Sequence, residues 1–368
     1  MALSRFDRGL WRLTRQVYLF SRRAFARTRG SASDPAADVQ RILLIRTDKI
    51  GDAIISTPLF KALRSRFPDA QIDIVLGHKN GAAAPLLPGL DGIFVARKNL
   101  IEQARLIRQL RERHYDVAID MLTGDSMTAA TYTVLSGARV NIGFAGKASG
   151  FYDIPVPRPP APEHQALQML RLVAPLGVTV KPEDIRIAVA YPQSSAEEVR
   201  KRLGLADRGD AKVVAINLSV AAVKYWTDEK FIRLAGDIKS PSVRIVLVGA
   251  PWDSARLEAV GKAAEVEWLP PSNDISETAA ALSCADLVIS PDTSIVHIAA
   301  ALNKPVVTLM ASYTANGEWY AWGVPYRALH CATRVADISY DEVLSAAREL
   351  MAEVDGGKQV AATDRVLS

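Results

Sequence analysis

Cysteine is scarce in this chain of 368 residues, where only Cys284 and Cys331 occur. Two cysteines so far apart in sequence exclude a disulfide framework and give no support to a zinc site, so we expect no metal and a reducing compartment. No run reaches the ~18–20 consecutive apolar residues that a helix needs to cross a bilayer. Hydrophobic and charged fractions of 49% and 23% exclude a largely disordered chain. Because a domain usually has about 100–200 residues, the length predicts two domains.

The sequence also lacks a GxGxxG turn after its first predicted strand, which leaves little support for a nicotinamide oxidoreductase. Its net charge is +5, yet the excess is confined to the first 33 residues, which contain eight arginines and one acid, Asp7. The rest of the chain is therefore slightly acidic. A folded body of that charge does not present a basic groove, so we expect no nucleic acid as a partner.

Residues 1–36 form a basic leader with the pattern of an amphipathic helix. Its apolar residues recur at alternating steps of three and four: Leu3, Phe6, Leu10, Leu13, Val17 and Phe20. An arginine-rich helix with such a face can lie in the headgroup layer of an anionic bilayer, and we predict this membrane contact for residues 1–30. A helix packed on the body, a partner-binding helix and a mitochondrial-type presequence are the alternatives. Arginines interrupt the apolar stretch, which disfavours a secretory signal.

Short β-branched runs alternate with longer amphipathic segments from residue 39 onward, which indicates βαβ units and mostly parallel sheets. In the first half we predict strands at residues 41–46, 71–76, 93–96 and 117–120, helices at 52–67, 100–113 and 164–175, and an irregular loop at 145–163. In the second half we predict strands at residues 212–218, 243–249, 287–290 and 305–310 and helices at 227–239, 252–264, 276–284, 293–302 and 339–354. The predicted fold class is therefore α/β.

These elements set the predicted domain boundaries. After the leader, residues 37–185 and 186–338 each form a Rossmann-like domain, and a helix at 339–354 is followed by a flexible polar tail at 355–368. Ligands of open parallel sheets bind at the carboxyl ends of the strands. We therefore expect the two parallel sheets to face each other across a cleft lined by these ends.

The first polar constellation follows the strand at residues 41–46 and contains Arg46, Asp48, Lys49 and Asp52. Aspartate commonly caps a helix, and for Asp52 taken alone that role is a sufficient explanation. Two acids beside two bases are, however, an expensive cluster for a simple turn. A carboxylate at a strand end that faces a cleft could instead act as a general base toward a substrate hydroxyl.

The second constellation follows the strand predicted at residues 212–218. Ser219 and Lys224 offer a hydroxyl and a compact positive charge, both suited to phosphate oxygens. The simpler alternative is a solvated lysine beside a packed tryptophan, Trp226.

The third constellation opens the helix predicted at residues 293–302. Asp292 and Thr293 precede Ser294 and His297, and the backbone amides at a helix N-terminus favour a phosphate. In the simpler alternative Asp292 only caps the helix, and His297 is a satisfied polar residue within it.

Together these constellations resemble glycosyltransferase family 9, which comprises the lipopolysaccharide heptosyltransferases. The segments that carry the resemblance are Asp48-Lys49-Ile50-Gly51-Asp52, Lys224-Tyr225-Trp226 and Asp292-Thr293-Ser294-Ile295-Val296-His297. The resemblance covers residues 39–354 and implies a GT-B fold with an N-terminal acceptor domain and a C-terminal nucleotide-sugar donor domain. It implies inverting transfer of a heptose from ADP-heptose to a lipid A-linked lipopolysaccharide core saccharide, without a metal or other cofactor.

We expect this enzyme to be a monomer in the cytoplasm, peripherally associated with the inner face of the inner membrane. The resemblance also assigns roles to single residues. Asp52 would be the general base, with Arg46, Asp48 and Lys49 as candidates on the acceptor side. The predicted donor-binding residues are Ser219 and Lys224 for the diphosphate, Thr293 and Ser294 for phosphates at the helix N-terminus, Asp292 for hydroxyls of the sugar, Asp253 for the ribose, and His297 for a contact or a structural role.

Several positions depart from the family pattern. Ser294 stands where a glycine is common, Thr227 replaces a proline, and residues 220–223 are less polar than this phosphate loop usually is. Two other hypotheses therefore stay open: a GT-B protein that binds a nucleotide sugar without catalysis, and a transferase that uses a different nucleotide sugar. A GT-B epimerase or phosphorylase is less favoured, because nothing supplies the extra acid/base pair that an epimerase needs.

Overall fold

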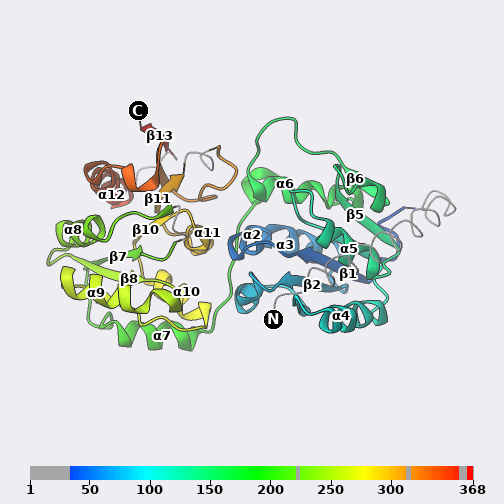
Figure 1. Cartoon of the computed structure of the whole chain (residues 1–368), viewed down its shortest axis with the longest axis horizontal. Coiled ribbons are helices and arrows are strands. Elements are labelled where there is room, and N and C mark those ends of the chain that lie inside the picture. The colour runs from blue at the N-terminus through cyan, green and yellow to red at the C-terminus, as the bar shows by residue number, and fades with distance from the viewer. Residues whose placement is uncertain (1–33, 221–223, 312–315, 356–362, 368) are drawn as a thin grey trace. The chain divides into compact units, whose positions relative to one another are not determined.

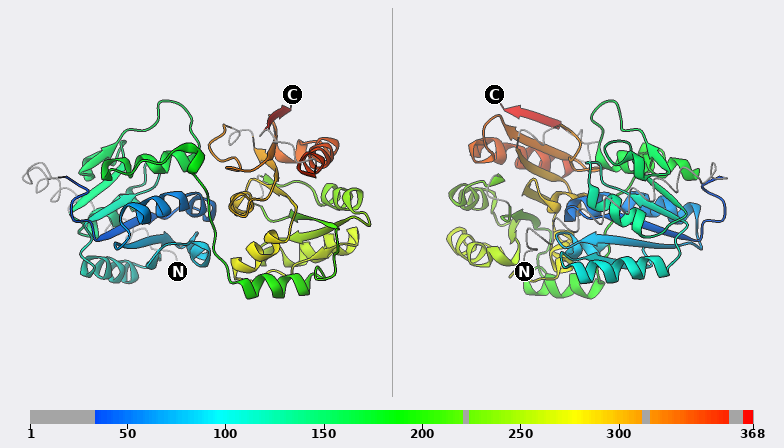
Figure 2. Two further views of the ribbon diagram at one scale, coloured as in Figure 1. Left: turned by 180° about the vertical axis from the view of Figure 1, so that it is seen from behind. Right: turned by 45° about the vertical axis from the view of Figure 1, so that its right-hand side comes forward.

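The computed structural model describes residues 34–220, 224–311, 316–355 and 363–367 (Figure 1). The chain divides between Ile185 and Arg186 into two compact units. Each unit is built around a parallel sheet with helices on both faces, as the further views in Figure 2 also show. The amphipathic helix predicted for the leader lies outside the described residues.

The described residues of the first unit form a six-stranded parallel sheet in the order β3-β2-β1-β4-β5-β6. Its strands are β1 (Arg41–Arg46), β2 (Gln71–Gly77), β3 (Gly92–Ala96), β4 (Val117–Asp120), β5 (Val140–Phe144) and β6 (Ile154–Val156). β1 pairs with β2 on one side and with β4 on the other. The chain thus changes the direction in which it adds strands at β1. The carboxyl end of β1 is therefore the switch point at which open α/β sheets bind ligands.

Helices cover both faces of the first sheet. They are α2 (Ile50–Ile55), α3 (Thr57–Arg66), α4 (Leu100–Glu112), α5 (Met127–Leu135) and α6 (Gln165–Arg171). Leu110 of α4 and Tyr132 of α5 belong to one core cluster with Leu43 and Ile45 of β1. α3 buries its own apolar side chains and contacts α6. The sheet is consequently buried on both sides, as its almost uninterrupted apolar strands require.

The described residues of the second unit form a seven-stranded parallel sheet in the order β13-β12-β11-β10-β7-β8-β9. Its strands are β7 (Lys212–Asn217), β8 (Val243–Val248), β9 (Glu267–Trp268), β10 (Leu287–Pro291), β11 (Val306–Ala311), β12 (Tyr326–Cys331) and β13 (Thr363–Leu367). β7 lies between β8 and β10. The carboxyl ends of β7 and β10 therefore form the switch point of this unit.

Six helices pack around the second sheet within the described residues. They are α7 (Gln193–Arg202), α8 (Asp228–Ile238), α9 (Ser254–Ala264), α10 (Ile275–Ser283), α11 (Ser294–Ala301) and α12 (Tyr340–Asp355). Phe231 of α8, Leu257 of α9 and Leu350 of α12 share a core cluster with Ile216 and Leu309 of the sheet. α10 contacts both α7 and α11. The helix that follows each switch-point strand is thereby held against a fixed sheet.

The single helix predicted at residues 52–67 is wrong. The segment forms two helices, α2 and α3, which meet at Ser56. Pro58 has no N–H to continue the hydrogen-bond pattern of α2, and it occupies the second position of a new helix that begins at Thr57. The break leaves the carbonyl of Asp52 to accept hydrogen bonds from Ser56 Oγ (2.8 Å) and from Arg46 Nε (3.2 Å). This change of helix shapes the first candidate site.

Two segments predicted to be irregular contain strands. β6 lies within the loop predicted at residues 145–163 and pairs with β5. Residues Thr363–Leu367 of the tail predicted to be flexible form β13, parallel to β12. A sheet edge presents unpaired backbone N–H and C=O groups, and a polar segment can pair with them through its backbone. The polar composition of the tail therefore misled the prediction.

Candidate functional site

Arg46 is the last residue of β1, and its side chain is completely buried. Its guanidinium donates to the backbone carbonyls of Asp52 and Met121. Nε lies 3.3 Å from Oδ1 of Asp48, and Nη2 lies 3.7 Å from Oδ1 of Asp52. A buried arginine needs such partners, because an uncompensated charge away from water is very costly. The sequence-predicted residues Arg46, Asp48 and Asp52 are thus brought together around one guanidinium.

Asp52 occupies the third position of α2 and is 5% exposed. Its Oδ2 accepts the backbone N–H of Lys49 (2.9 Å), which helps to close the first turn of the helix. Burial raises the pKa of Asp52 to about 6; Arg46 opposes that rise and Asp48 adds to it. Asp52 therefore contributes to the helix start, as the simpler interpretation expected, and is also a carboxylate of unusual basicity.

Asp120 is a buried carboxyl group that was not predicted from the sequence as a site residue. It ends β4 and lies opposite Ile45 in the register of β1. Its Oδ2 accepts the hydroxyl of Tyr152 (2.7 Å), and burial raises its pKa to about 7 against the opposing charge of Arg46. The signal in the sequence was an acid at the very end of a predicted buried strand.

A close backbone approach gives Tyr152 access to Asp120. A Cβ at Gly143 would lie 2.5 Å from the Tyr152 ring, so any larger residue would displace the ring. The glycine in β5 therefore has a specific packing reason.

Four basic residues at the carboxyl ends of β2 and β3 were also not predicted. His78 and Lys79 follow β2, Arg97 and Lys98 follow β3, and all four are exposed. Loss of some hydration against the neighbouring chain and the positive charges of Lys98 and Lys79 lower the pKa of His78. Because the strands are parallel and adjacent, these bases lie at the same carboxyl ends of the sheet as Asp52. The edge is therefore suited to an anionic ligand.

In the second unit, Asn217 connects the two strands of the switch point. This last residue of β7 donates from Nδ2 to Ser290 Oγ of β10 (3.0 Å) and to Thr293 Oγ1 (3.2 Å). Thr293 Oγ1 in turn accepts the N–H of Ile295 (3.3 Å) and is the N-cap of α11. The helix cap is thus Thr293, and the alternative that Asp292 only caps this helix is wrong.

Lys224 and Asp292 form an ion pair at the start of α11. Lys224 Nζ donates to the carboxylate of Asp292 and also to its backbone carbonyl (3.3 Å). Their side chains are only 14% and 10% exposed. The pair places a cation beside the N-terminus of an eight-residue helix that begins at Ser294. Such a terminus carries a partial positive charge and unpaired N–H groups, which favour the binding of an anion.

Ser219 and Asp253 are joined by a hydrogen bond between the ends of β7 and β8. Ser219 Oγ accepts the N–H of Ala250 (2.6 Å) and donates to Asp253 Oδ2 (2.5 Å). Asp253 lies just before α9 without capping that helix through its side chain. The residue predicted for the ribose is thus held beside one predicted for the diphosphate.

Trp226 and His297 are both buried inside the second unit. Trp226 is fully buried, packs edge to face on Phe231 with ring centroids 4.9 Å apart, and donates from Nε1 to the carbonyl of Ile338 (3.0 Å). His297 is buried within α11. Thr227 caps α8 by accepting the Lys230 N–H (3.4 Å), which gives this departure from the family pattern a local function.

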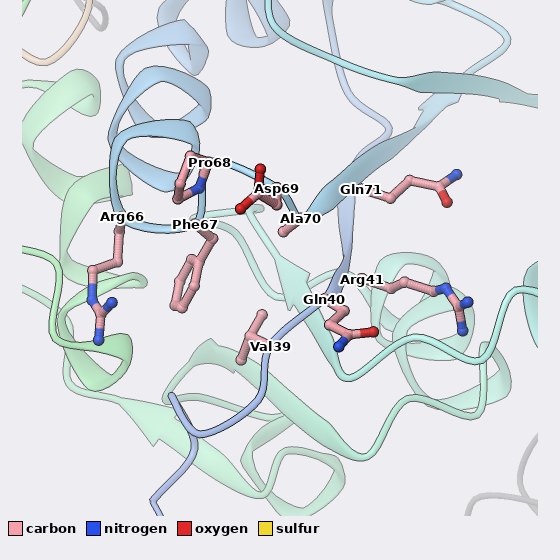
Figure 3. Close-up of a pocket in the computed structure, with 9 residues that line it drawn as sticks. All are labelled: Val39, Gln40, Arg41, Arg66, Phe67, Pro68, Asp69, Ala70 and Gln71. Atoms are coloured by element: carbon pink, nitrogen blue, oxygen red, sulfur yellow. The ribbon is translucent and has the colours of Figure 1, made fainter.

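A pocket of about 460 Å³ in the first unit does not belong to these groups (Figure 3). Its lining runs from Val39 to Arg41 and from Arg66 to Gln71, which are the amino ends of β1 and β2. The pocket therefore lies at the amino ends of the strands, whereas Asp52 lies beyond their carboxyl ends. Among the described residues no three His, Cys, Asp or Glu side chains gather as a metal-binding group. No helix in the described parts is both long and apolar enough to cross a membrane.

Comparison with known sequences identifies the family of this chain. Residues 103–342 match the sequence model of glycosyltransferase family 9 (heptosyltransferase). Lipopolysaccharide heptosyltransferase 3 of Escherichia coli is 25% identical over 293 residues, which are 74% of this chain and 83% of that protein. The family 9 glycosyl transferase of Veillonella parvula has a solved structure with a TM-score of 0.73 at 20% identity, covering 88% of this chain and 99% of the other.

A solved structure with a ligand is also similar. It is E. coli heptosyltransferase WaaC with ADP-2-deoxy-2-fluoro heptose, with a TM-score of 0.66 at 20% identity, covering 84% of this chain and 99% of the other. These likenesses and the two parallel sheets confirm the predicted α/β fold of GT-B type with two Rossmann-like domains. Since the family model matches well over half of the sequence, the chain belongs to glycosyltransferase family 9 and is a glycosyltransferase.

Proposed function

We propose that this chain is an inverting heptosyltransferase that transfers a heptose from ADP-heptose to a lipid A-linked core saccharide. The observation that carries the proposal is the carboxylate of Asp52, 5% exposed at a switch point and with its pKa raised to about 6. The WaaC structure with ADP-2-deoxy-2-fluoro heptose supports the donor. The similarity to lipopolysaccharide heptosyltransferase 3 supports the class of acceptor.

In the proposed reaction Asp52 accepts the proton of the attacking acceptor hydroxyl. A carboxylate with a pKa near 6 is ionised at neutral pH and is a stronger base than an ordinary aspartate. The acceptor oxygen forms a bond to the anomeric carbon of the heptose as the bond from that carbon to the diphosphate breaks. ADP leaves with the bonding electron pair, and the configuration inverts. Arg46, Asp48 and Lys49 surround the base on the acceptor side.

The donor side of the proposal uses the second switch point. Negative charge develops on the leaving diphosphate, and fixed positive groups stabilise it best where it forms. Lys224, the N-terminus of α11 with Thr293 and Ser294, and the Ser219 hydroxyl supply such groups. Asp292 would hold hydroxyls of the sugar, and Asp253 the ribose. We propose that these groups replace a divalent cation, so EDTA should leave the transfer rate unchanged.

The proposed function is tested by incubating the purified chain with labelled ADP-heptose and a series of truncated lipopolysaccharide cores. Formation of a core carrying one added heptose, with ADP released in equal amount, is the expected result. ADP-heptose binding without product on any core would support the non-catalytic alternative. Product only with another nucleotide sugar would overturn the donor assignment.

The pH dependence of transfer is expected to report the ionisation of Asp52. Because only the ionised carboxylate accepts a proton, kcat/KM should rise with pH through a midpoint near 6 and level off above it. Asp48 raises that pKa through its negative charge, so Asp48→Asn should move the midpoint to lower pH. Asp120, with a pKa of about 7, is a second titrating group, and Asp120→Asn should leave the Asp52 limb in place. An unchanged midpoint in Asp48→Asn would contradict this explanation.

We also propose that the basic leader holds the enzyme at an anionic membrane, where a lipid-linked acceptor lies. Its eight arginines and apolar stripe match an interfacial helix. Deleting residues 1–30 should abolish most binding to anionic liposomes while activity on a soluble acceptor analogue changes less than about twofold, since no proposed site residue is removed. Sedimentation with liposomes measures the binding, and neutral liposomes serve as the control. Equal sedimentation of both chains would refute the role.

A further inference from the structure

Trp252 presents a large aromatic side chain to solvent. It is 82% exposed, whereas Trp226 of the same unit is fully buried. Tryptophan buries more apolar area than almost any other side chain when it is covered, so leaving it exposed forgoes a large hydrophobic stabilisation. A side chain of this kind on a rigid turn is well suited to ligand binding.

The turn that carries Trp252 is firmly placed. Trp252 is the middle residue of a 3₁₀ turn, Pro251–Asp253, between β8 and α9. Its neighbour Asp253 is fixed by the hydrogen bond from Ser219 Oγ (2.5 Å). Gly249 lets the chain pass close to Leu257 of α9 and to Ser219, because a Cβ there would lie 2.5 Å from Leu257 Cδ1 and 2.8 Å from Ser219 Oγ. The indole therefore extends from a fixed backbone at the carboxyl end of β8.

The order of the strands indicates which part of the proposed donor would lie beside this turn. Going across the sheet, β10 is followed by Asp292 and α11, β7 by Ser219 and Lys224, and β8 by Trp252 and Asp253. The groups suited to a diphosphate lie at the ends of β10 and β7. The hydrogen bond between Ser219 and Asp253 joins the end of β7 to the end of β8. A nucleotide laid along this edge from its phosphates through its ribose reaches its base at β8.

We infer that the indole of Trp252 stacks on the purine base of the bound donor nucleotide and contributes to its affinity. This inference rests on the proposed function, because it places the nucleotide of that donor. Stacking on a flat heterocycle uses the exposed face of the ring. Asp253 remains beside it as an acceptor for the ribose hydroxyls, since its Oδ1 has no hydrogen-bond partner among the described residues.

The experiment compares Trp252→Ala and Trp252→Phe with the unmodified chain by calorimetric titration with ADP and with inorganic pyrophosphate. Because the base loses a stacking partner at an exposed site, we expect the Kd of ADP to rise about fivefold to tenfold in Trp252→Ala. Trp252→Phe keeps a ring and should stay within about twofold. The Kd of pyrophosphate should be the same in all three, because it has no base.

A matched control removes exposed apolar surface in the other unit. Ile101 is 64% exposed near the start of α4, and Ile101→Ala should bind ADP like the unmodified chain. Equal ADP affinity in Trp252→Ala and the unmodified chain would overturn the stacking role alone. A parallel loss of ADP and pyrophosphate affinity would show a disturbed phosphate site and would overturn it as well. An unmodified chain that binds no ADP would overturn the proposed donor together with this inference.

Discussion

Replacing Asp52 by asparagine should lower the rate of heptosyl transfer by about 10²–10⁴-fold, the usual contribution of a general base. The amide has no pKa in the working range and cannot take the proton of the acceptor hydroxyl. ADP binding should be unchanged, because the proposed donor residues belong to the second unit. Transfer is measured under saturating ADP-heptose, and ADP affinity by calorimetry.

Asparagine is the informative substitution at this position. Its side-chain oxygen can still accept the Lys49 N–H that Asp52 Oδ2 accepts (2.9 Å), so α2 should keep its first turn. Asp69→Asn is the matched control, because it makes the same chemical change at an exposed residue of the opposite sheet edge (Figure 3). A rate for Asp52→Asn within tenfold of the control would remove Asp52 from the mechanism.

Replacing Lys224 by methionine should lower kcat by about 10²–10³-fold, as the loss of one preorganised group at a developing charge does. The methionine keeps most of the apolar length of the side chain but removes the cation beside the N-terminus of α11. The Kd of ADP should rise as well, since the diphosphate loses its positive partner. Lys262→Met is the control, because Lys262 is 66% exposed and pairs with Glu258 on the surface of α9, away from the proposed site residues.

The ion pair with Asp292 makes a sharper version of this test possible. Lys224→Met leaves the Asp292 carboxylate, 10% exposed, without its cation and close to the proposed phosphates. Adding Asp292→Asn removes that carboxylate charge, and Asp292→Asn alone measures what is lost when Asp292 no longer holds the sugar hydroxyls, so the double variant is compared with this single variant. If Lys224 acts on the diphosphate, the double variant stays slow. If the single variant is slow only because of an unpaired Asp292, the double variant recovers, and Lys224 has no direct role.

Periodicity located the elements that position both candidate sites. The predicted strands at residues 41–46 and 117–120 coincide with β1 and β4, because a buried parallel strand is a short, continuous apolar run. Asp52, Ser219 and Asp292 could be nominated for the same reason: each is a polar residue that follows such a run. Asp120 could have been added on this signal.

Segments whose sequence has no one-sided pattern were missed. α5 is buried on nearly every side, so it has no polar stripe to reveal its period. β12 contains Arg327, which is 3% exposed and whose guanidinium pairs with Glu353 of α12 (2.5 Å). A charged residue within a short apolar run favours the prediction of a loop, because the partner that allows its burial lies far away in the sequence.

Local spacing along the chain was enough to specify the α/β alternation and the polar residues at strand ends, because each depends on neighbours within a few positions. The partners of those residues depend on strand order. Ser219 meets Asp253 across 34 positions, and Lys224 meets Asp292 across 68. Arg46 comes near Asp120 because β1 pairs with β4 as well as with β2, the next strand along the chain. Such pairings are settled when the sheet assembles, since burial and hydrogen bonding between remote segments select them and no short stretch of sequence encodes them.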